Sequence, residues 1–127
     1  MNIYYEGFFI LNDLDSKLAK PIQYKHATTE YRPKELHTHL YGKTANFAII
    51  GYGCDGVNEG YKVALLSCED EELEKLYSNI PVPHITLSIS SEGKAKDTRN
   101  LNFKDYHDGT IIKAIFGGFC EKPILRW

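Results

Sequence analysis

The chain has 127 residues, of which 43% are hydrophobic and 25% are charged, and its formal net charge is −2. This length accommodates one hydrophobic core of ordinary size, so we predict a single domain over residues 1–127. The balance of apolar and charged residues excludes an intrinsically disordered chain. The slightly negative charge argues against a protein that grips long RNA or DNA through a basic surface.

Three cysteines, Cys54, Cys68 and Cys120, are widely spaced and form no CxxC pair. This spacing predicts reduced thiols, with neither a disulfide framework nor a zinc site. The first residues show no basic segment followed by an apolar stretch, and no apolar run is long enough to span a bilayer. We therefore expect a cytoplasmic protein (of the host cell, if the protein is viral) that does not contact a membrane and has no obligate protein partner.

The first third of the chain shows the period-two alternation that is typical of strands. We predict a strand over residues 3–11 and a short helix over residues 13–20, where two leucines lie four residues apart. Pro21 ends that helix, and a second strand follows over residues 22–31. Residues 32–43 are polar and contain proline and glycine, which predicts a loop or a single turn.

Two further strands are predicted over residues 46–52 and 61–67, joined by a long hairpin connection that is dense in turn-forming residues. The clearest helix covers residues 67–79, with Ser67 as its N-cap and acidic residues in its first turn. A strand over residues 82–90 follows. The last elements are a polar loop or helix and a final strand, over residues 92–101 and 110–116. Many strands with few helices predict the α+β class, with a mixed or antiparallel sheet.

The strand predicted over residues 82–90 has one polar face. Alternate side chains of a strand share a face, so its polar residues point one way and the apolar residues between them point into the core. The polar set is His84, Thr86, Ser88 and Ser90. The same His-x-Thr doublet occurs earlier as His26 and Thr28, where the opposite face is less apolar. An imidazole beside a threonine hydroxyl is suited to proton transfer and hydrogen bonding.

Two such doublets provide what cleavage of a phosphodiester without a metal requires. One histidine deprotonates the attacking water or hydroxyl and the other protonates the leaving oxygen, and each transfer contributes about 10²–10⁴ in rate. The two threonine hydroxyls bind the non-bridging oxygens. The pattern does not decide which histidine is base and which is acid. The alternative interpretation is that both are partly buried strand histidines that bond to their neighbours.

The sequence resembles the two-histidine (2H), LigT-like phosphoesterase superfamily over roughly residues 3–116. The resemblance rests on four segments, residues 25–29, 51–60, 81–88 and 93–98, of which the first and the third contain the two doublets. These are similar to a subgroup that occurs in viruses and in RNA-ligase-associated phosphodiesterase domains. Phage anti-CBASS enzymes, which destroy cyclic nucleotide signals, belong to the same superfamily.

This resemblance implies a two-lobed fold of mostly antiparallel sheets with few helices, in which each lobe contributes one doublet to a central cleft. It implies that the catalytic residues are His26, Thr28, His84 and Thr86, and that the enzyme uses no metal and no cofactor. Thr29 follows the first doublet, where family members often have an apolar residue.

Three functions fit these residues. The first, which we expect, is cleavage of a cyclic nucleotide messenger such as cGAMP or another cyclic dinucleotide or oligonucleotide, for viral immune evasion. The second is cleavage of RNA 2′,3′-cyclic phosphates or 2′-5′ linkages during RNA end processing. The third is a non-catalytic nucleotide-binding sponge, which the loss of either histidine would favour. The small size and the lack of a basic surface favour the first over the second.

Five residues are candidates for substrate binding: Tyr5, Tyr24 and Trp127 as stacking platforms, Ser88 on the polar strand face, and Lys94 as a cation for phosphate. Each also fits ordinary packing or an exposed loop.

Other polar groups receive structural interpretations. His37 and His39 have the spacing of a metal pair, but they lie in a predicted loop without acids or cysteines at ligand spacing, so we expect a solvated loop. Asn58 and Glu59 are expected in the hairpin turn, with contact to a base edge as the alternative. His107 is expected in a surface turn.

Overall fold

The computed structural model describes residues 2–127, which form one nine-stranded sheet, one α-helix and two short 3-10 helices. The strands are β1 (Tyr5–Ile10), β2 (Lys20–Pro21), β3 (His26–Tyr31), β4 (Thr44–Cys54), β5 (Asn58–Cys68), β6 (His84–Ile89), β7 (Lys104–Asp105), β8 (Ile111–Cys120) and β9 (Lys122–Ile124). The helices are α1 (Glu71–Ser78), η1 (Thr38–Leu40) and η2 (Ala95–Asn100). The strand pairs are antiparallel, which confirms the α+β class. Among the described residues, no helix combines the length and the apolar character that crossing a membrane would need.

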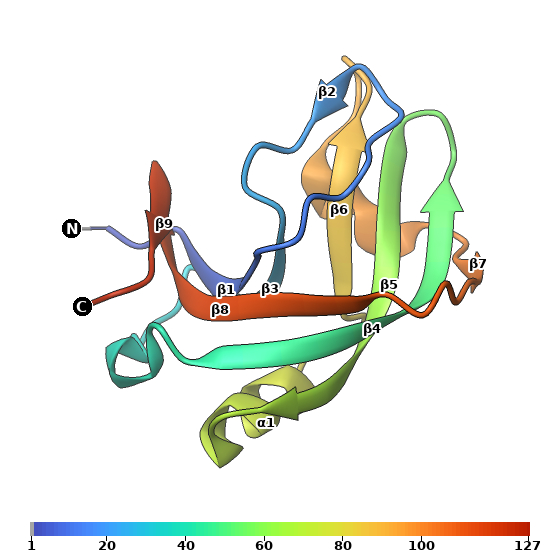
Figure 1. The fold of residues 1–127 in the computed structure, drawn as a ribbon. Helices are drawn as coiled ribbons and strands as arrows, with labels where there is room; N and C mark the ends of the chain where they lie inside the picture. The colour runs from blue at the N-terminus through green and yellow to red at the C-terminus, as the bar shows by residue number, and fades with distance from the viewer. Residues whose placement is uncertain (1) are drawn as a thin grey trace.

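The order of the strands brings the two doublets together. Along the hydrogen-bonded path the order is β2-β6-β5-β4-β8-β1-β3, with β7 beside β4 and β9 beside β8. β3, which carries the first doublet, ends this path, and β6, which carries the second, lies next to its other end. The sheet is bent so strongly that Cα atoms of β3 and β6 approach within 8 Å. Figure 1 shows β1, β3 and β8 on one side of the bend and β5 and β6 on the other.

The hydrophobic core holds both doublets in place through their middle residues. Phe8 meets Phe47 and Phe116 edge to face, with ring centroids 5.0 Å and 5.5 Å apart. Ala27 and Ile85, the residues between histidine and threonine in the two doublets, are fully buried in the same cluster. Because neighbouring side chains of a strand point to opposite faces, this burial turns each histidine away from the core.

The segment over residues 13–20 was predicted as a helix, and that prediction is wrong. The backbone N–H of Lys17 donates to Glu59 Oε1 over 2.9 Å, and the N–H of Leu18 donates to Ser88 Oγ over 3.1 Å. Hydrogen bonds to distant buried side chains therefore replace the bonds that a helix would make within itself. Two strand boundaries also differ from the prediction: β3 begins four residues later than predicted, and β8 continues four residues beyond residue 116.

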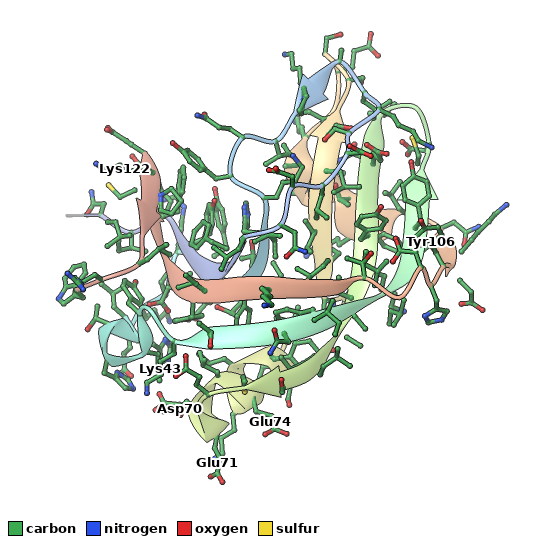
Figure 2. The ribbon with its side chains drawn as sticks, viewed as in Figure 1. Lys43, Asp70, Glu71, Glu74, Tyr106 and Lys122 are labelled. Carbon is green, nitrogen blue, oxygen red and sulfur yellow. The ribbon has the colours of Figure 1, made fainter. Side chains whose placement is uncertain are left out.

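The helix α1 begins later than predicted, and Ser67 is not its cap. β5 continues past Ser67, and the N-cap is Asp70, whose carboxylate accepts a hydrogen bond of 2.8 Å from the N–H of Glu72. The acids of the first turn lie near the positive end of the helix dipole, as expected. Figure 2 shows two of them, Glu71 and Glu74, at the end of the molecule opposite β2.

The hairpin between β4 and β5 is much tighter than the predicted connection over residues 53–60. The Asp55 carboxylate accepts hydrogen bonds of 2.9 Å and 2.8 Å from the N–H groups of Val57 and Asn58, which closes the turn within a few residues. Asn58 and Glu59 are buried residues of β5, so their placement in the turn was wrong. The glycines in this segment predicted a long turn, but Gly53 and Gly60 lie within the strands, where they allow close packing.

Each doublet lies opposite a glycine at an irregular point of its strand pair. Thr28 pairs with Gly7 of β1, and Thr86 pairs with Gly60 of β5. In both pairs the register shifts beside the glycine, so the residue after the threonine is an extra, bulged residue. A Cβ on either glycine would approach the carbonyl oxygen of the doublet's middle residue to under 3.0 Å. Only glycine therefore fits at these two positions.

The Gly7→Ala substitution tests this constraint. It should lower the free energy of unfolding by about 1–3 kcal/mol, because the new methyl group would clash with the backbone of Ala27. That backbone cannot shift without displacing the core in which the Ala27 side chain is packed. Gly53→Ala is the matched control, since its methyl group would meet only side-chain atoms, at 3.1 Å and beyond. Chemical denaturation measures both, and equal losses would contradict a special role for the backbone contact.

Candidate active site

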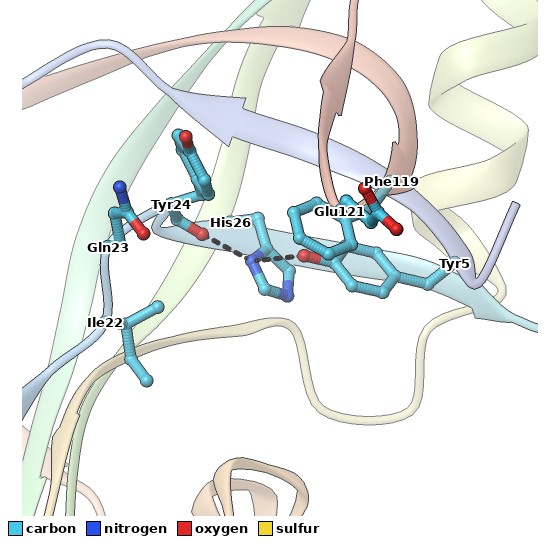
Figure 3. Close-up of a pocket in the computed structure, with 7 residues that line it drawn as sticks. All are labelled: Tyr5, Ile22, Gln23, Tyr24, His26, Phe119 and Glu121. Carbon is cyan, nitrogen blue, oxygen red and sulfur yellow. Dashed lines mark hydrogen bonds between the residues drawn. The ribbon is translucent and has the colours of Figure 1, made fainter.

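The two histidine rings are held in the same way. His26 Nδ1 lies 2.8 Å from the carbonyl oxygen of Tyr24, and His84 Nδ1 lies 2.7 Å from that of Val82, two residues upstream in each case. A carbonyl oxygen only accepts, so Nδ1 carries the proton and Nε2 of the neutral ring is an unprotonated base. Figure 3 shows the second ring nitrogen of His26 pointing away from these bonds.

The Nε2 atoms of His26 and His84 are accessible. Both residues are partly exposed, and within residues 2–127 neither Nε2 has a hydrogen-bonding partner. Every fully buried polar side-chain atom in residues 2–127 has a hydrogen-bonding partner. Because the two Nε2 atoms have none, they are exposed to solvent. β3 and β6 approach within 8 Å at the Cα atoms, and the charge of His84 acts on His26, so the two imidazoles lie near each other and define the candidate site.

Electrostatics keep both histidines neutral near pH 7. Burial lowers the pKa of His26, and the charge that His84 would carry lowers it further, against the opposing effect of the hydrogen bond to Tyr24. Burial also lowers the pKa of His84, opposed by the bond to Val82 and assisted by the nearby charge of Arg99. Since the ordinary pKa of histidine is about 6.5, the free protein presents two neutral imidazoles at pH 7.

Tyr5 orients His26 and is not a free stacking platform. Its ring stacks on the His26 ring with centroids 4.4 Å apart, and its other side stacks on Phe119 at 5.0 Å. Its hydroxyl lies 3.2 Å from His26 Nδ1, and because that nitrogen donates, the Tyr5 oxygen accepts. Burial raises the pKa of Tyr5, so the hydroxyl stays neutral.

The two threonines of the doublets differ in their surroundings. Thr28 is half-buried, and within the described residues its hydroxyl has no partner, so it is available to a ligand. Thr86 is buried, with its hydroxyl 2.9 Å from Thr98 Oγ1 and 3.2 Å from the carbonyl oxygen of Ala95. The second threonine therefore holds η2, whereas the hydroxyl of the first is unoccupied.

Ser88 does not share a face with His84 and Thr86. The bulge after Thr86 adds one residue, so that Thr86 pairs with Gly60 and Ser88 with Glu59, and neighbouring residues of β5 face opposite ways. Ser88 is fully buried, and its hydroxyl donates to Glu59 Oε1 over 2.6 Å. The predicted alternation fails there because the partner strand decides where a bulge forms.

A pocket of about 240 Å³ lies beside His26 (Figure 3). Its lining residues are Tyr5, Ile22, Gln23, Tyr24, His26, Phe119 and Glu121. Tyr24 is 38% exposed and its ring offers a face for stacking. Trp127 is exposed but packs edge to face on Tyr41 with centroids 6.0 Å apart, outside the pocket lining. The exposed Lys94 directly precedes η2 and lies outside the pocket lining.

His37 and His39 are not simply solvated, contrary to the prediction. His37 Nδ1 lies 2.8 Å from Oε1 of the fully buried Glu6, and His39 Nε2 lies 3.0 Å from Glu72. Donor atoms of Glu6, Glu30 and His37 lie within 4.8 Å of one another, the spacing of a metal site. The Glu6 oxygens already accept hydrogen bonds from His37, so this cluster is explained as an anchor for the segment after β3. This contact could not be predicted from the sequence because Glu6 and His37 lie 31 residues apart.

Arg99, Thr98 and Phe119 belong to the surroundings of the two histidines, and the sequence analysis missed all three. Phe119 pairs with Tyr5 across β8 and β1, and its place in an alternating apolar strand was the only signal for it. Nothing local marks Thr98 or Arg99, because η2 reaches β6 only through tertiary contacts.

The chain has no match among known proteins in three comparisons: no protein-family model, no curated protein and no solved structure matches it.

Nuclear magnetic resonance of the histidine ring nitrogens tests the arrangement of the two imidazoles. At pH 7.5 we expect His26 and His84 in the Nδ1–H form, with Nε2 unprotonated, because each Nδ1 donates to a carbonyl. Both should titrate below about 6.5 because burial disfavours the charged ring. An Nε2–H form in either ring, or a pKa above 6.5 in the free protein, would contradict the assignment.

Replacement of each threonine by valine tests their difference. Thr86→Val should lower the free energy of unfolding by about 1–3 kcal/mol, because it leaves buried partners in η2 without a hydrogen bond. Thr28→Val should change it by no more than about 0.5 kcal/mol, because that hydroxyl has no partner to lose. Thermal or chemical denaturation measures both, and equal effects would refute the asymmetry.

Proposed function

We propose that the chain is a metal-independent phosphodiesterase in which His26 and His84 act as a general acid–base pair on one phosphodiester. The observation that carries this proposal is that β3 and β6, which approach within 8 Å at the Cα atoms, each carry an imidazole with Nδ1 tied to a carbonyl and Nε2 free. Two proton transfers on opposite sides of one phosphorus atom need two such groups.

The two histidines divide the proposed reaction between them. Nε2 of one neutral imidazole takes a proton from the attacking water or ribose hydroxyl while that oxygen bonds to phosphorus. The bond from phosphorus to the leaving oxygen breaks, and the protonated Nε2 of the other imidazole donates its proton to that oxygen. Solvent then returns each ring to its starting state. The bond from Nδ1 to a carbonyl serves both roles, because it orients the ring and stabilises positive charge on it.

The residues beside the histidines suit an anionic substrate. The Thr28 hydroxyl is free to donate to a non-bridging oxygen. Lys62 pairs directly with His84 across β5 and β6, and so shares its face. The charge of Arg99 acts on His84 from η2. Aromatic rings thus lie beside His26 and cations beside His84, which suits a nucleotide with its base at the first and its phosphate between the two.

A cyclic nucleotide messenger, such as a cyclic dinucleotide or oligonucleotide, is the substrate class that we favour. The pocket beside His26, with Tyr24 and Phe119 in its lining, offers aromatic surface for one base. The net charge of −2 gives little support for a track along which a long RNA backbone would run. RNA with a 2′,3′-cyclic phosphate end remains the alternative substrate, and it would use the same histidines.

We also infer that the strand pairs β1–β3 and β5–β6 correspond to the two lobes of a LigT-like fold. Three features support this. Each pair carries one doublet, each doublet faces a glycine, and each threonine is followed by a bulge.

A panel of cyclic mononucleotides, cyclic dinucleotides and RNA with cyclic phosphate ends, incubated in EDTA and read by chromatography, tests this proposal. We expect turnover of a cyclic nucleotide with metal removed. His26→Ala and His84→Ala should each lower kcat by about 10² or more, because each removes one proton transfer. His107→Ala, at an exposed turn, is the matched control and should keep wild-type turnover.

The pH dependence of the same reaction is a second readout. The productive form has one neutral and one protonated histidine, and burial lowers both pKa values in the free protein. As pH falls from 7 the productive form becomes more populated, and it is lost again when both rings are protonated. The kcat/KM profile should therefore be a bell with its maximum below about 6.5. Loss of turnover in EDTA, or a flat profile, would refute paired histidine catalysis, and binding without turnover would leave a nucleotide sponge.

A further inference from the structure

The segment η2 is fixed on the strand that carries the second doublet. Thr98 is fully buried, and its hydroxyl oxygen lies 2.9 Å from that of Thr86. The Thr86 hydroxyl also lies 3.2 Å from the carbonyl oxygen of Ala95, at the first residue of η2. β6 therefore binds both the beginning and the fourth residue of this short helix.

The neighbouring strand β5 holds η2 as well. The Asn58 amide donates to Thr98 Oγ1 over 3.0 Å and to the carbonyl oxygen of Lys94 over 2.7 Å. Gly60 makes room for this contact, because a Cβ there would approach the Thr98 side chain to under 3.0 Å. Gly60 pairs with Thr86, so η2 lies over the same face of the sheet as the second doublet.

This attachment places Arg99 beside the second histidine. Thr98 is the buried residue of η2 and faces the strands, whereas Lys96 and Arg99, three residues apart and therefore on one side of the 3-10 helix, are exposed. Arg99 is exposed and forms no ion pair among the described residues. Arg99 directly follows Thr98, whose hydroxyl contacts that of Thr86, and Thr86 shares a face of β6 with His84, so Arg99 lies on the side of the sheet that carries the His84 ring. In keeping with this placement, the charge of Arg99 contributes to the lowered pKa of His84, after the larger effect of burial.

We propose that η2 is a phosphate-binding arm and that the Arg99 guanidinium contacts the phosphate between His26 and His84. The position of that phosphate rests on the proposed function. A guanidinium presents several N–H donors in a planar fork that matches two phosphate oxygens, and its charge stabilises the anion. In this proposal Thr86 of the second doublet holds the arm that carries Arg99, whereas the hydroxyl of Thr28 in the first doublet is itself free to contact the phosphate.

Binding of 3′-AMP and of adenosine, measured by calorimetry on the full chain, tests the arm without relying on turnover. Arg99→Ala should weaken 3′-AMP binding by about 10- to 100-fold and change adenosine binding by no more than about 2-fold, because only the nucleotide carries phosphate. Arg99→Lys should recover part of the loss. Asn58→Ala should also weaken 3′-AMP binding, but less, by loosening η2. Lys75→Ala, which removes one exposed positive charge from α1, is the matched control and should bind as the wild type does.

The outcomes separate the arm from the catalytic proposal. Unchanged 3′-AMP binding in Arg99→Ala, or equal losses for 3′-AMP and adenosine, would overturn the arm. If the wild-type chain cleaves no phosphodiester but its 3′-AMP binding depends on Arg99, the catalytic proposal fails and the phosphate-binding arm stands. Turnover of 2′,3′-cyclic AMP with kcat/KM lowered by about 10- to 100-fold in Arg99→Ala would support both.

Discussion

The arrangement of β3 and β6 depends on how closely a carbonyl oxygen in each doublet approaches the opposite strand. The oxygen of Ala27 lies against Gly7, and that of Ile85 lies against Gly60, so near that neither glycine can be replaced by a larger residue without a shift. A bulge accompanies each close approach, and bulges bend and twist the strands that contain them. Two strand pairs distorted in this way, together with two further register shifts between β4 and β5, accompany the bend that brings β3 to β6.

A buried glutamate lies beside each of these two bulges. Glu6 and Glu59 directly precede the two glycines and are 0% and 1% exposed. A buried carboxylate is costly unless hydrogen bonds satisfy it, and here each accepts one from a tyrosine hydroxyl, Tyr41 and Tyr52 respectively. Each also accepts from a backbone N–H of a long connecting segment, which ties that segment to the sheet. The two halves therefore share a strand pairing, a glycine, a bulge and a buried acid.

The surroundings of the two histidines differ, and this difference gives the candidate site a direction. Beside His26, Tyr5 and Phe119 form an aromatic stack and Thr28 is left free. Beside His84, the threonine is covered by η2, and cationic side chains take the place of aromatic ones. A ligand with an aromatic end and an anionic end would meet matching surroundings in only one orientation.

The sequence by itself determined the strand-rich α+β class, the burial of Ile85, and the two doublets as the notable polar pattern, because side-chain alternation along a strand is a local property. Only the tertiary structure decided the facing of Ser88, since a bulge depends on the partner strand and reverses the facing of every residue after it. Residues 13–20 likewise form no helix, because their backbone N–H groups donate to buried side chains that lie at least 42 residues further along the chain. η2 lies against β5 and β6 only because Asn58, Thr86 and Thr98 meet in space. The sequence pattern of one segment does not say which distant segments will pack against it. Contacts between distant segments were therefore decided only by the tertiary structure.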